Sequence, residues 1–173
     1  MKKLSVIYIL IFLSFISSTI SPQQVNEKIR IGIFDSRCVA LVYGRSGLFL
    51  TYMEDLRKEL DNAKQEENGE RVKELESILP TNQLIIKQQV FSTGSIKNII
   101  EKIEDKITEI AEDNDLSFII SKWEIVYDDQ SFELVDITDQ LVELFNPDEQ
   151  TLKILENVKS TEPAPIEQIS APE

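Results

Sequence analysis

This 173-residue sequence contains no histidine. Ser-His and Cys-His nucleophile pairs are therefore excluded, and so are the histidine ligands that most catalytic zinc sites require. No other pair of side chains stands out as a nucleophile with its base. We therefore expect a protein that is not an enzyme and that uses no cofactor and no metal.

Cysteine occurs once, as Cys38, which excludes an intramolecular disulfide. A lone cysteine can be a reactive thiol, or it can form a bridge to another molecule. The sequence favours a third role, a small buried side chain, because the neighbouring positions are apolar. These neighbours are Ile33, Phe34, Val39 and Ala40.

Basic side chains are scarce, with 18 lysines and arginines against 31 aspartates and glutamates, for a net charge of −13. The imbalance belongs to the C-terminal half, because residues 95–173 contain six basic and 20 acidic residues, a net charge of −14. Such a negative field disfavours nucleic acid and anionic lipid as partners. It suits solubility and basic partners, so we predict no nucleic-acid binding.

The N-terminus has the three-part layout of a secretory signal peptide. Met1–Lys3 is a short basic segment, Leu4–Ile16 is almost entirely apolar, and Ser17–Ser21 supplies small residues for cleavage. The apolar run is short for a membrane-spanning helix, which needs about 20 residues, although an uncleaved anchor is the alternative. We predict export to the periplasm or another extracytoplasmic space of a bacterium, with no integral membrane span after cleavage.

The predicted organisation has a signal peptide at 1–21, one folded domain at 22–146, a C-terminal helix at 147–159 and a tail at 160–173. The chain that follows the signal peptide is long enough to form one domain with its own core. The tail is expected to be disordered, because it contains several prolines and few large apolar residues.

Hydrophobic periodicity predicts elements of both kinds. Alternating apolar residues favour a strand near 29–34, and apolar residues three and four apart predict a helix over 48–66. A polar turn at 67–69 leads into a second helix, which we expect Pro80 to interrupt. Further predicted elements are a helix over 95–113, strands at 116–120, 123–127 and 132–135, and a last helix over 147–159 with Asn146 as its N-terminal cap.

These elements predict an α+β fold with a small β-sheet core, in which the strand near 29–34 pairs with strands in 116–136. A projecting α-helical hairpin, about 47–113, is inserted between these strands, and helices follow at the C-terminus. The isoleucines between 96 and 110 have near-heptad spacing. They could form a subunit seam or client groove, or they could pack within the monomer, and the sequence leaves both open.

The order of elements in the C-terminal third resembles the OmpH/Skp family of periplasmic chaperones. The stretches 114–120, 126–127 and 135–138 fall in the order that the family uses, and the first predicted strand matches the strand that follows its signal peptide. The resemblance covers about 30–145. It implies a homotrimer whose strands form the assembly core and whose hairpins enclose unfolded outer-membrane proteins.

The resemblance predicts an exported Skp-like binding protein, a holdase chaperone for unfolded envelope proteins. The alternative is a non-catalytic accessory or structural component of a cell-envelope complex without chaperone activity, which the acidic charge and short arms favour. Both functions require contact with a protein partner or another subunit. The candidate contact residues are Phe49, Leu56, Leu60, Ile85 and Trp123.

Two polar motifs could indicate other sites. The stretch 35–37 could lie at a site at a strand end, but a helix cap combined with a salt bridge explains it better. The acidic clusters at 113–115 and 128–129 lack the alternating ligands and the bidentate glutamate of a calcium loop. We interpret them as helix-end and turn residues.

Overall fold

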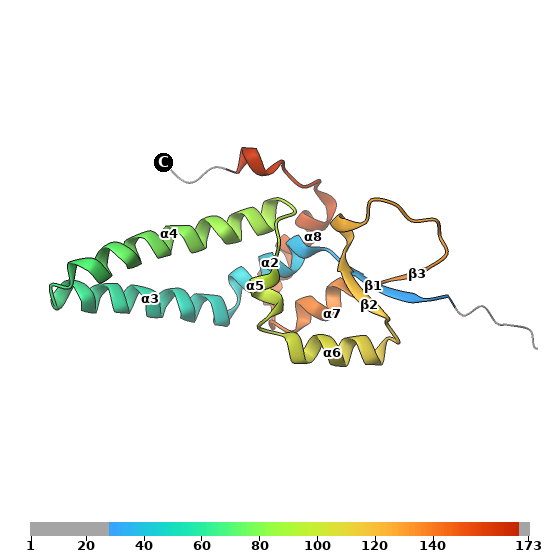
Figure 1. Ribbon diagram of the computed structural model, residues 1–173, viewed down its shortest axis with the longest axis horizontal. Coiled ribbons are helices and arrows are strands. Elements are labelled where there is room, and N and C mark those ends of the chain that lie inside the picture. The colour runs from blue at the N-terminus through green and yellow to red at the C-terminus, as the bar shows by residue number, and fades with distance from the viewer. Residues whose placement is uncertain (1–27, 170–173) are drawn as a thin grey trace, which may run out of the picture.

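A computed structural model of the protein describes residues 28–169, so the predicted signal peptide at 1–21 lies outside the described residues. A small β-sheet forms one end of the molecule and a long helical hairpin projects from the other (Figure 1). The remaining helices lie between these two ends. This arrangement confirms the predicted α+β class, with its projecting hairpin and C-terminal helices.

The sheet has three parallel strands, with β1 (Arg30–Phe34) between β2 (Phe118–Ser121) and β3 (Glu133–Asp136). The first strand thus pairs with both later strands, as predicted, although they lie more than 80 residues further along the chain. Parallel neighbours require a long crossover connection. All the helices from α2 to α6 lie in the connection from β1 to β2.

The helix α2 (Ser36–Arg45) lies at the centre of the core. Its residues from 36 to 43 are all buried, as expected of a helix covered on every side. It packs against both arms of the hairpin and against α7 (Thr138–Glu143) and α8 (Glu149–Ser160). One helix therefore joins the sheet end to the hairpin.

The hairpin consists of α3 (Gly47–Gln65) and α4 (Gly69–Phe91), which pack side by side with a turn at 66–68 (Figure 1). The antiparallel pairing and the position of the turn confirm the prediction. The expected interruption at Pro80 is wrong, because α4 continues through it. Burial of Leu75 and partial burial of Leu79 on the preceding turns hold the helix in place despite the missing N–H.

The hairpin ends at residue 91, and the predicted helix over 95–113 is divided into α5 (Lys97–Ile100) and α6 (Glu104–Asp113). The break changes the direction of the chain, so that isoleucines of both pieces reach the core. Ile96, Ile99, Ile103 and Ile110 are all buried there. Of the two roles left open for this stripe, packing within the monomer is the one that its burial supports.

The predicted strand at 123–127 does not form. A 3-10 turn, η1 (Lys122–Glu124), is followed instead by an irregular loop at 125–132 that returns to β3 (Figure 1). The predicted cap at Asn146 is also wrong. The carboxylate of Asp148 accepts a hydrogen bond from the Thr151 amide at 2.7 Å, and α8 begins at residue 149.

We expected the chain beyond residue 160 to be disordered, but residues 161–169 follow a defined path beside α4. The amide of Ala164 donates a hydrogen bond to the carbonyl of Phe91 at 2.7 Å. A short 3-10 turn, η2 (Ile166–Gln168), follows, and Ile169 is buried. Between residues 28 and 169, no helix combines the length and apolar character needed to cross a membrane.

Candidate partner-binding site

The outer face of the sheet carries a row of apolar side chains. The strand register places Ile31 of β1 directly between Phe118 of β2 and Leu134 of β3. Because side chains alternate along a strand, Gly32, Ile119 and Val135 belong to the opposite face, and Ile119 and Val135 pack there against the core. The outer row therefore points away from the core, and its central residue Ile31 is nevertheless buried.

The loop at 125–132 lies over this outer face and encloses a pocket of about 370 Å³ with it. The cover is incomplete. Phe118 is 50% exposed, and the loop itself presents Val126 and Tyr127 at 98% and 82% exposure. Phe132 and Leu134 are also exposed. We call these five residues the sheet-face surface.

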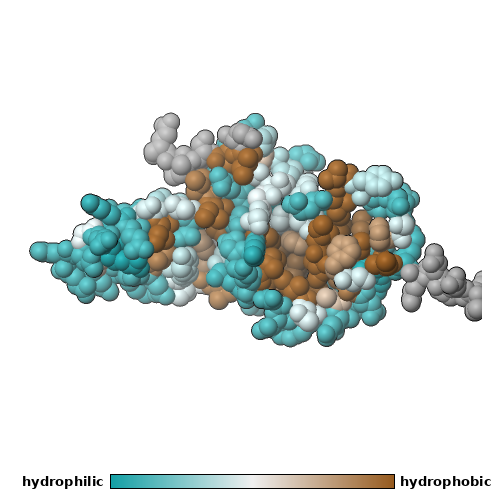
Figure 2. Space-filling model, in the orientation of Figure 1, coloured by the Kyte–Doolittle hydropathy of each residue, from teal (hydrophilic) through white to brown (hydrophobic). Residues whose placement is uncertain are grey.

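Apolar surface gathers in the central part and at the sheet end, while the hairpin tip is hydrophilic (Figure 2). Several adjacent large apolar side chains on an otherwise charged protein mark a contact site more strongly than scattered ones. Within the described residues, the sheet-face surface is thus the best candidate for a binding site.

Trp123 fixes the first residues of the covering loop to the core. Its indole Nε1 donates to Oδ1 of Asp35 at 3.0 Å, and Lys122 Nζ lies 2.9 Å from Oδ2 of the same carboxylate. The Arg37 guanidinium and the Lys122 ammonium each lie 4.6 Å from the centre of the indole ring, within cation–π range. The loop therefore starts from a rigid anchor at the C-terminal end of β1.

The Asp35 carboxylate is almost fully buried and is satisfied by several donors. It caps α2 through the Arg37 amide at 3.0 Å and pairs with the Arg37 guanidinium at 3.1 Å. Burial alone would raise the pKa of Asp35, but hydrogen bonds from Arg37, Lys122 and Trp123 outweigh it and lower the pKa to about 2. The carboxylate is therefore charged at neutral pH.

The same cluster ties distant parts of the chain together. Arg37 donates to the carbonyls of Val158 and Thr161, at 3.1 and 2.7 Å, near the C-terminal end of α8. The amide of Asp35 donates to the hydroxyl of Thr138 at 2.9 Å, at the start of α7. These contacts confirm that the stretch 35–37 is a cap combined with a salt bridge.

Cys38 is fully buried beside this cluster. Burial, reinforced by the charge on Asp35, raises the pKa of its thiol to about 12. A thiol with such a pKa holds its proton at neutral pH and is a poor nucleophile. Of the predicted roles, the structure supports the buried small side chain.

The structure places the five candidate contact residues in different surroundings. Phe49 is buried against Tyr43, with ring centroids 5.4 Å apart. Leu56 and Leu60 are half-buried on α3, and Ile85 is exposed on α4. Trp123 is half-buried beside Asp35, so these residues do not form one surface.

Two exposed groups of apolar residues were not predicted from the sequence. Leu48, Leu50 and Tyr52 are exposed at the base of α3. Leu50 lies outside the apolar stripe of this helix, and an apolar residue off the stripe is a signal that could have identified it. The second group consists of Val126 and Tyr127. It was not identified because residues 123–127 were predicted to form a strand of the sheet.

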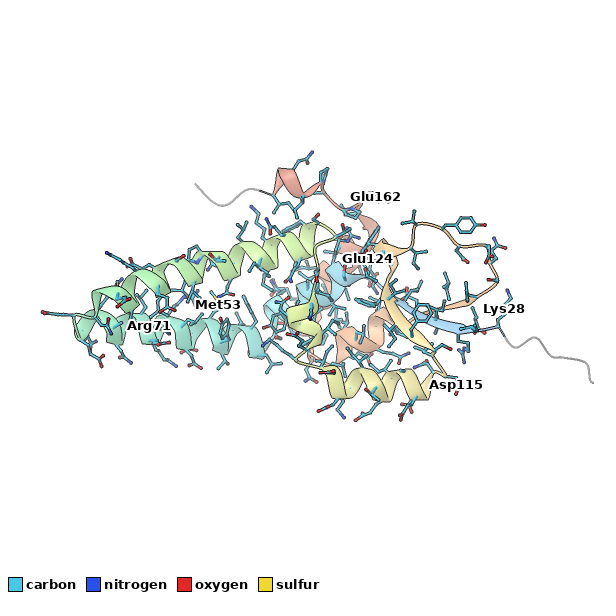
Figure 3. The ribbon with its side chains drawn as sticks, viewed as in Figure 1. Lys28, Met53, Arg71, Asp115, Glu124 and Glu162 are labelled. Atoms are coloured by element: carbon cyan, nitrogen blue, oxygen red, sulfur yellow. The ribbon has the colours of Figure 1, made fainter. Side chains whose placement is uncertain are left out.

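The hairpin buries its own apolar stripe. Met53 and Leu75 are buried on the inner sides of α3 and α4, and the labelled Met53 lies between the arms while Arg71 lies near the tip (Figure 3). Ion pairs cross between the arms, from Lys64 to Glu76 at 3.1 Å and from Arg71 to Glu59. The tip is therefore a closed, charged surface rather than an apolar groove.

Comparison with known proteins identifies no relative: no family model, no curated protein and no solved structure matches the chain. Across the described residues, no group of three or more histidine, cysteine, aspartate or glutamate side chains is placed to hold a metal ion.

Proposed function

We propose that this protein is an exported, non-catalytic binding protein of the OmpH/Skp type, acting on unfolded or envelope proteins in the periplasm or an equivalent space. The observation that carries the proposal is the sheet-face surface, where Phe118, Val126 and Tyr127 are exposed together at the sheet end. The order of strand, hairpin and returning strands supports the same assignment.

In this proposal the sheet-face surface joins copies of the chain into a homo-oligomer, a trimer by resemblance. Covering these apolar side chains removes their exposed surface from water, which favours association. The exposed residues at the hairpin base, Leu48, Leu50 and Tyr52, then contact an unfolded client.

Light scattering of the mature protein tests the assembly. We expect a mass above the monomer value, and a shift to the monomer in the variant Tyr127→Asp. The matched control is Tyr52→Asp on α3, which is exposed but lies outside the sheet-face surface. A monomeric parent protein, or an equal effect of both variants, would contradict the assembly.

Chaperone activity requires a separate assay. The protein should slow the aggregation of an unfolded outer-membrane protein diluted from urea, and Leu50→Asp should weaken this effect while leaving the oligomer intact. If the parent protein has no effect on aggregation, the holdase part of the proposal is wrong and the assembly can still stand.

The second candidate is an accessory or structural role in a cell-envelope complex. It is favoured by the short hairpin, whose tip carries ion pairs such as Arg71 with Glu59 and leaves no apolar groove. Crosslinking in intact cells separates the two functions. One stable partner in fixed proportion favours the accessory role, whereas many unfolded partners favour the chaperone.

A further inference from the structure

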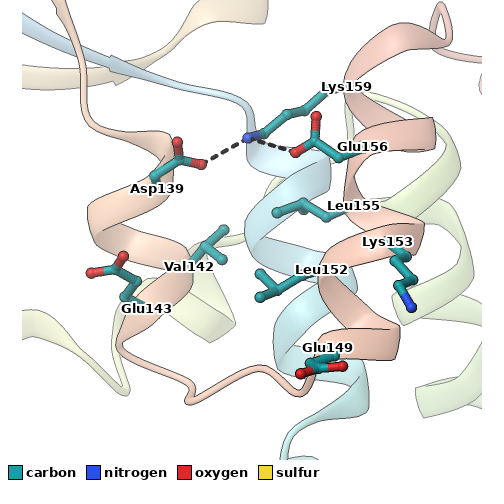
Figure 4. A pocket seen from close by; sticks show the side chains of 9 residues that line it. All are labelled: Asp139, Val142, Glu143, Glu149, Leu152, Lys153, Leu155, Glu156 and Lys159. Atoms are coloured by element: carbon teal, nitrogen blue, oxygen red, sulfur yellow. Dashed lines mark hydrogen bonds and ion pairs between the residues drawn. The ribbon is translucent and has the colours of Figure 1, made fainter.

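The helices α7 and α8 lie side by side and leave a groove between them on the outer surface. Its volume is about 520 Å³, and its apolar part is formed by Val142, Leu152 and Leu155 (Figure 4). Val142 and Leu155 are buried, whereas Leu152 is 43% exposed. Both helices pack on α2 with their inner sides, so only their outer sides are free.

The rim of the groove is acidic. Asp139 and Glu143 come from α7, and Glu149 and Glu156 come from α8. Two lysines also line it, which leaves a net charge of −2 over the six charged side chains.

The lysines do not neutralise the whole rim. Lys159 spans one end, with its Nζ 2.8 Å from Asp139 and 3.3 Å from Glu156 (Figure 4). At the other end, Glu143 and Glu149 form no ion pair within the described part of the chain. The second lysine, Lys153, lines the groove from α8 and forms no ion pair with Glu143 or Glu149 (Figure 4).

We propose that this groove is a docking site for an amphipathic helix of a partner protein, with leucine-like side chains on one face and lysine or arginine beside them. Two adjacent helices leave a groove that a third helix fills by packing its side chains between theirs. The partner's apolar face would cover Leu152, and its basic side chains would meet Glu143 and Glu149.

The charge of the surrounding chain supports the same partner. Residues 95–173 carry six basic and 20 acidic residues, so the groove lies in the most acidic part of the sequence. Such a field attracts a basic segment and repels an acidic one. The proposed site is separate from the sheet-face surface, with which it shares no residue.

Fluorescence anisotropy with a labelled peptide tests this site. The probe is a leucine–lysine peptide of about 14 residues, with its leucines three and four positions apart so that they form one helical face. A leucine–glutamate peptide with the same spacing is the second probe. We expect the intact protein to bind the lysine peptide, more weakly as salt is added, and not to bind the glutamate peptide.

Two variants alter the groove and two matched variants do not. Leu152→Asp is compared with Ile166→Asp, because each is a large aliphatic side chain that is nearly half exposed and Ile166 lies outside the groove. Glu143→Lys is compared with Glu112→Lys, because each is an exposed acid in the last turn of its helix. Circular dichroism verifies that all four variants fold.

The groove variants should each weaken the binding of the lysine peptide about tenfold, and the controls should change it about twofold or less. Three results would overturn the proposal: no binding by the intact protein, equal binding of both peptides, or equal losses in the groove variants and their controls. The last result would mean that the peptide responds to overall charge and not to this groove.

Discussion

The indole of Trp123 donates a hydrogen bond to the carboxylate of Asp35, at 3.0 Å and across 88 positions of sequence. This contact joins the only tryptophan of the chain to the N-terminal cap of its central helix. It also sets the position from which the loop at 125–132 crosses the outer face of the sheet. The stability of the core and the shape of the candidate binding surface are thus linked through one side chain.

Replacing Trp123 by phenylalanine should destabilise the fold. The substitution keeps an aromatic ring beside Arg37 but removes one hydrogen bond to a buried carboxylate, a loss of about 1.5–3 kcal/mol. Urea unfolding followed by circular dichroism measures the difference. Tyr127→Phe is the control, because that side chain is exposed, and it should change the free energy of unfolding very little. Equal stability of both variants would contradict the role given to the indole.

Acid should weaken the fold through Asp35. Its folded-state pKa of about 2 lies below its ordinary value of 3.8, so the group stabilises the protein above pH 4. That contribution, about 2 kcal/mol for a shift of this size, is lost as the pH falls from about 4 toward 2. Urea midpoints between pH 6 and pH 2 measure it.

Asp35→Asn provides the comparison for this pH dependence. The variant should be less stable at neutral pH, because Arg37 loses its buried partner, and its stability should fall less steeply between about pH 4 and pH 2. Other carboxylates of the chain titrate in both proteins, so the difference between the two profiles isolates Asp35. Parallel profiles would show that this carboxylate does not carry the predicted pH dependence.

The sequence was sufficient to predict the hairpin, because the hairpin depends on strong periodic patterns, whereas the pairing of the first strand with the later ones was predicted from the order of the elements. The stripe from Leu48 to Ala63 is a local property, and a second stripe close by gives it a partner. The break between α5 and α6 could not be predicted, because no glycine or proline marks residues 101–103. The chain changes direction there because isoleucines of both helices pack into the core, and that is a property of the tertiary structure.

The candidate site was less accessible to sequence analysis. Residues 123–127 are rich in β-branched and aromatic side chains, as a strand would be, and the hydrogen bond from Trp123 to the distant Asp35 takes them out of the sheet. The groove between α7 and α8 also has no local signature, since Val142 and Leu152 belong to separate helices. Surfaces made by tertiary contact are not contained in the periodicity of any one segment.

Gly32 should not tolerate a side chain. A Cβ at this position would lie 2.7 Å from Leu116 Cδ1 and 3.0 Å from Ile119 Cγ1, on the inner face of the central strand. Gly32→Ala should therefore cost about 1–3 kcal/mol through overpacking. Gly94→Ala is the control, because a Cβ there meets no atom within 4 Å. If thermal unfolding shows the two variants to be equally stable, the inner face is less tightly packed than described.

The thiol of Cys38 should be inert in the folded protein and reactive in the unfolded one. It is fully buried, and burial raises its pKa to about 12. At neutral pH the thiol is therefore neither reachable by a reagent nor ionised to the reactive thiolate. Ellman's reagent at pH 8 should give almost no colour with the native protein and one equivalent in urea. Because labelling then requires opening of the core, Trp123→Phe should label faster than the parent protein in buffer, while Tyr127→Phe should not. Rapid labelling of the native parent protein would instead place the thiol at a surface and would contradict the packing of α2.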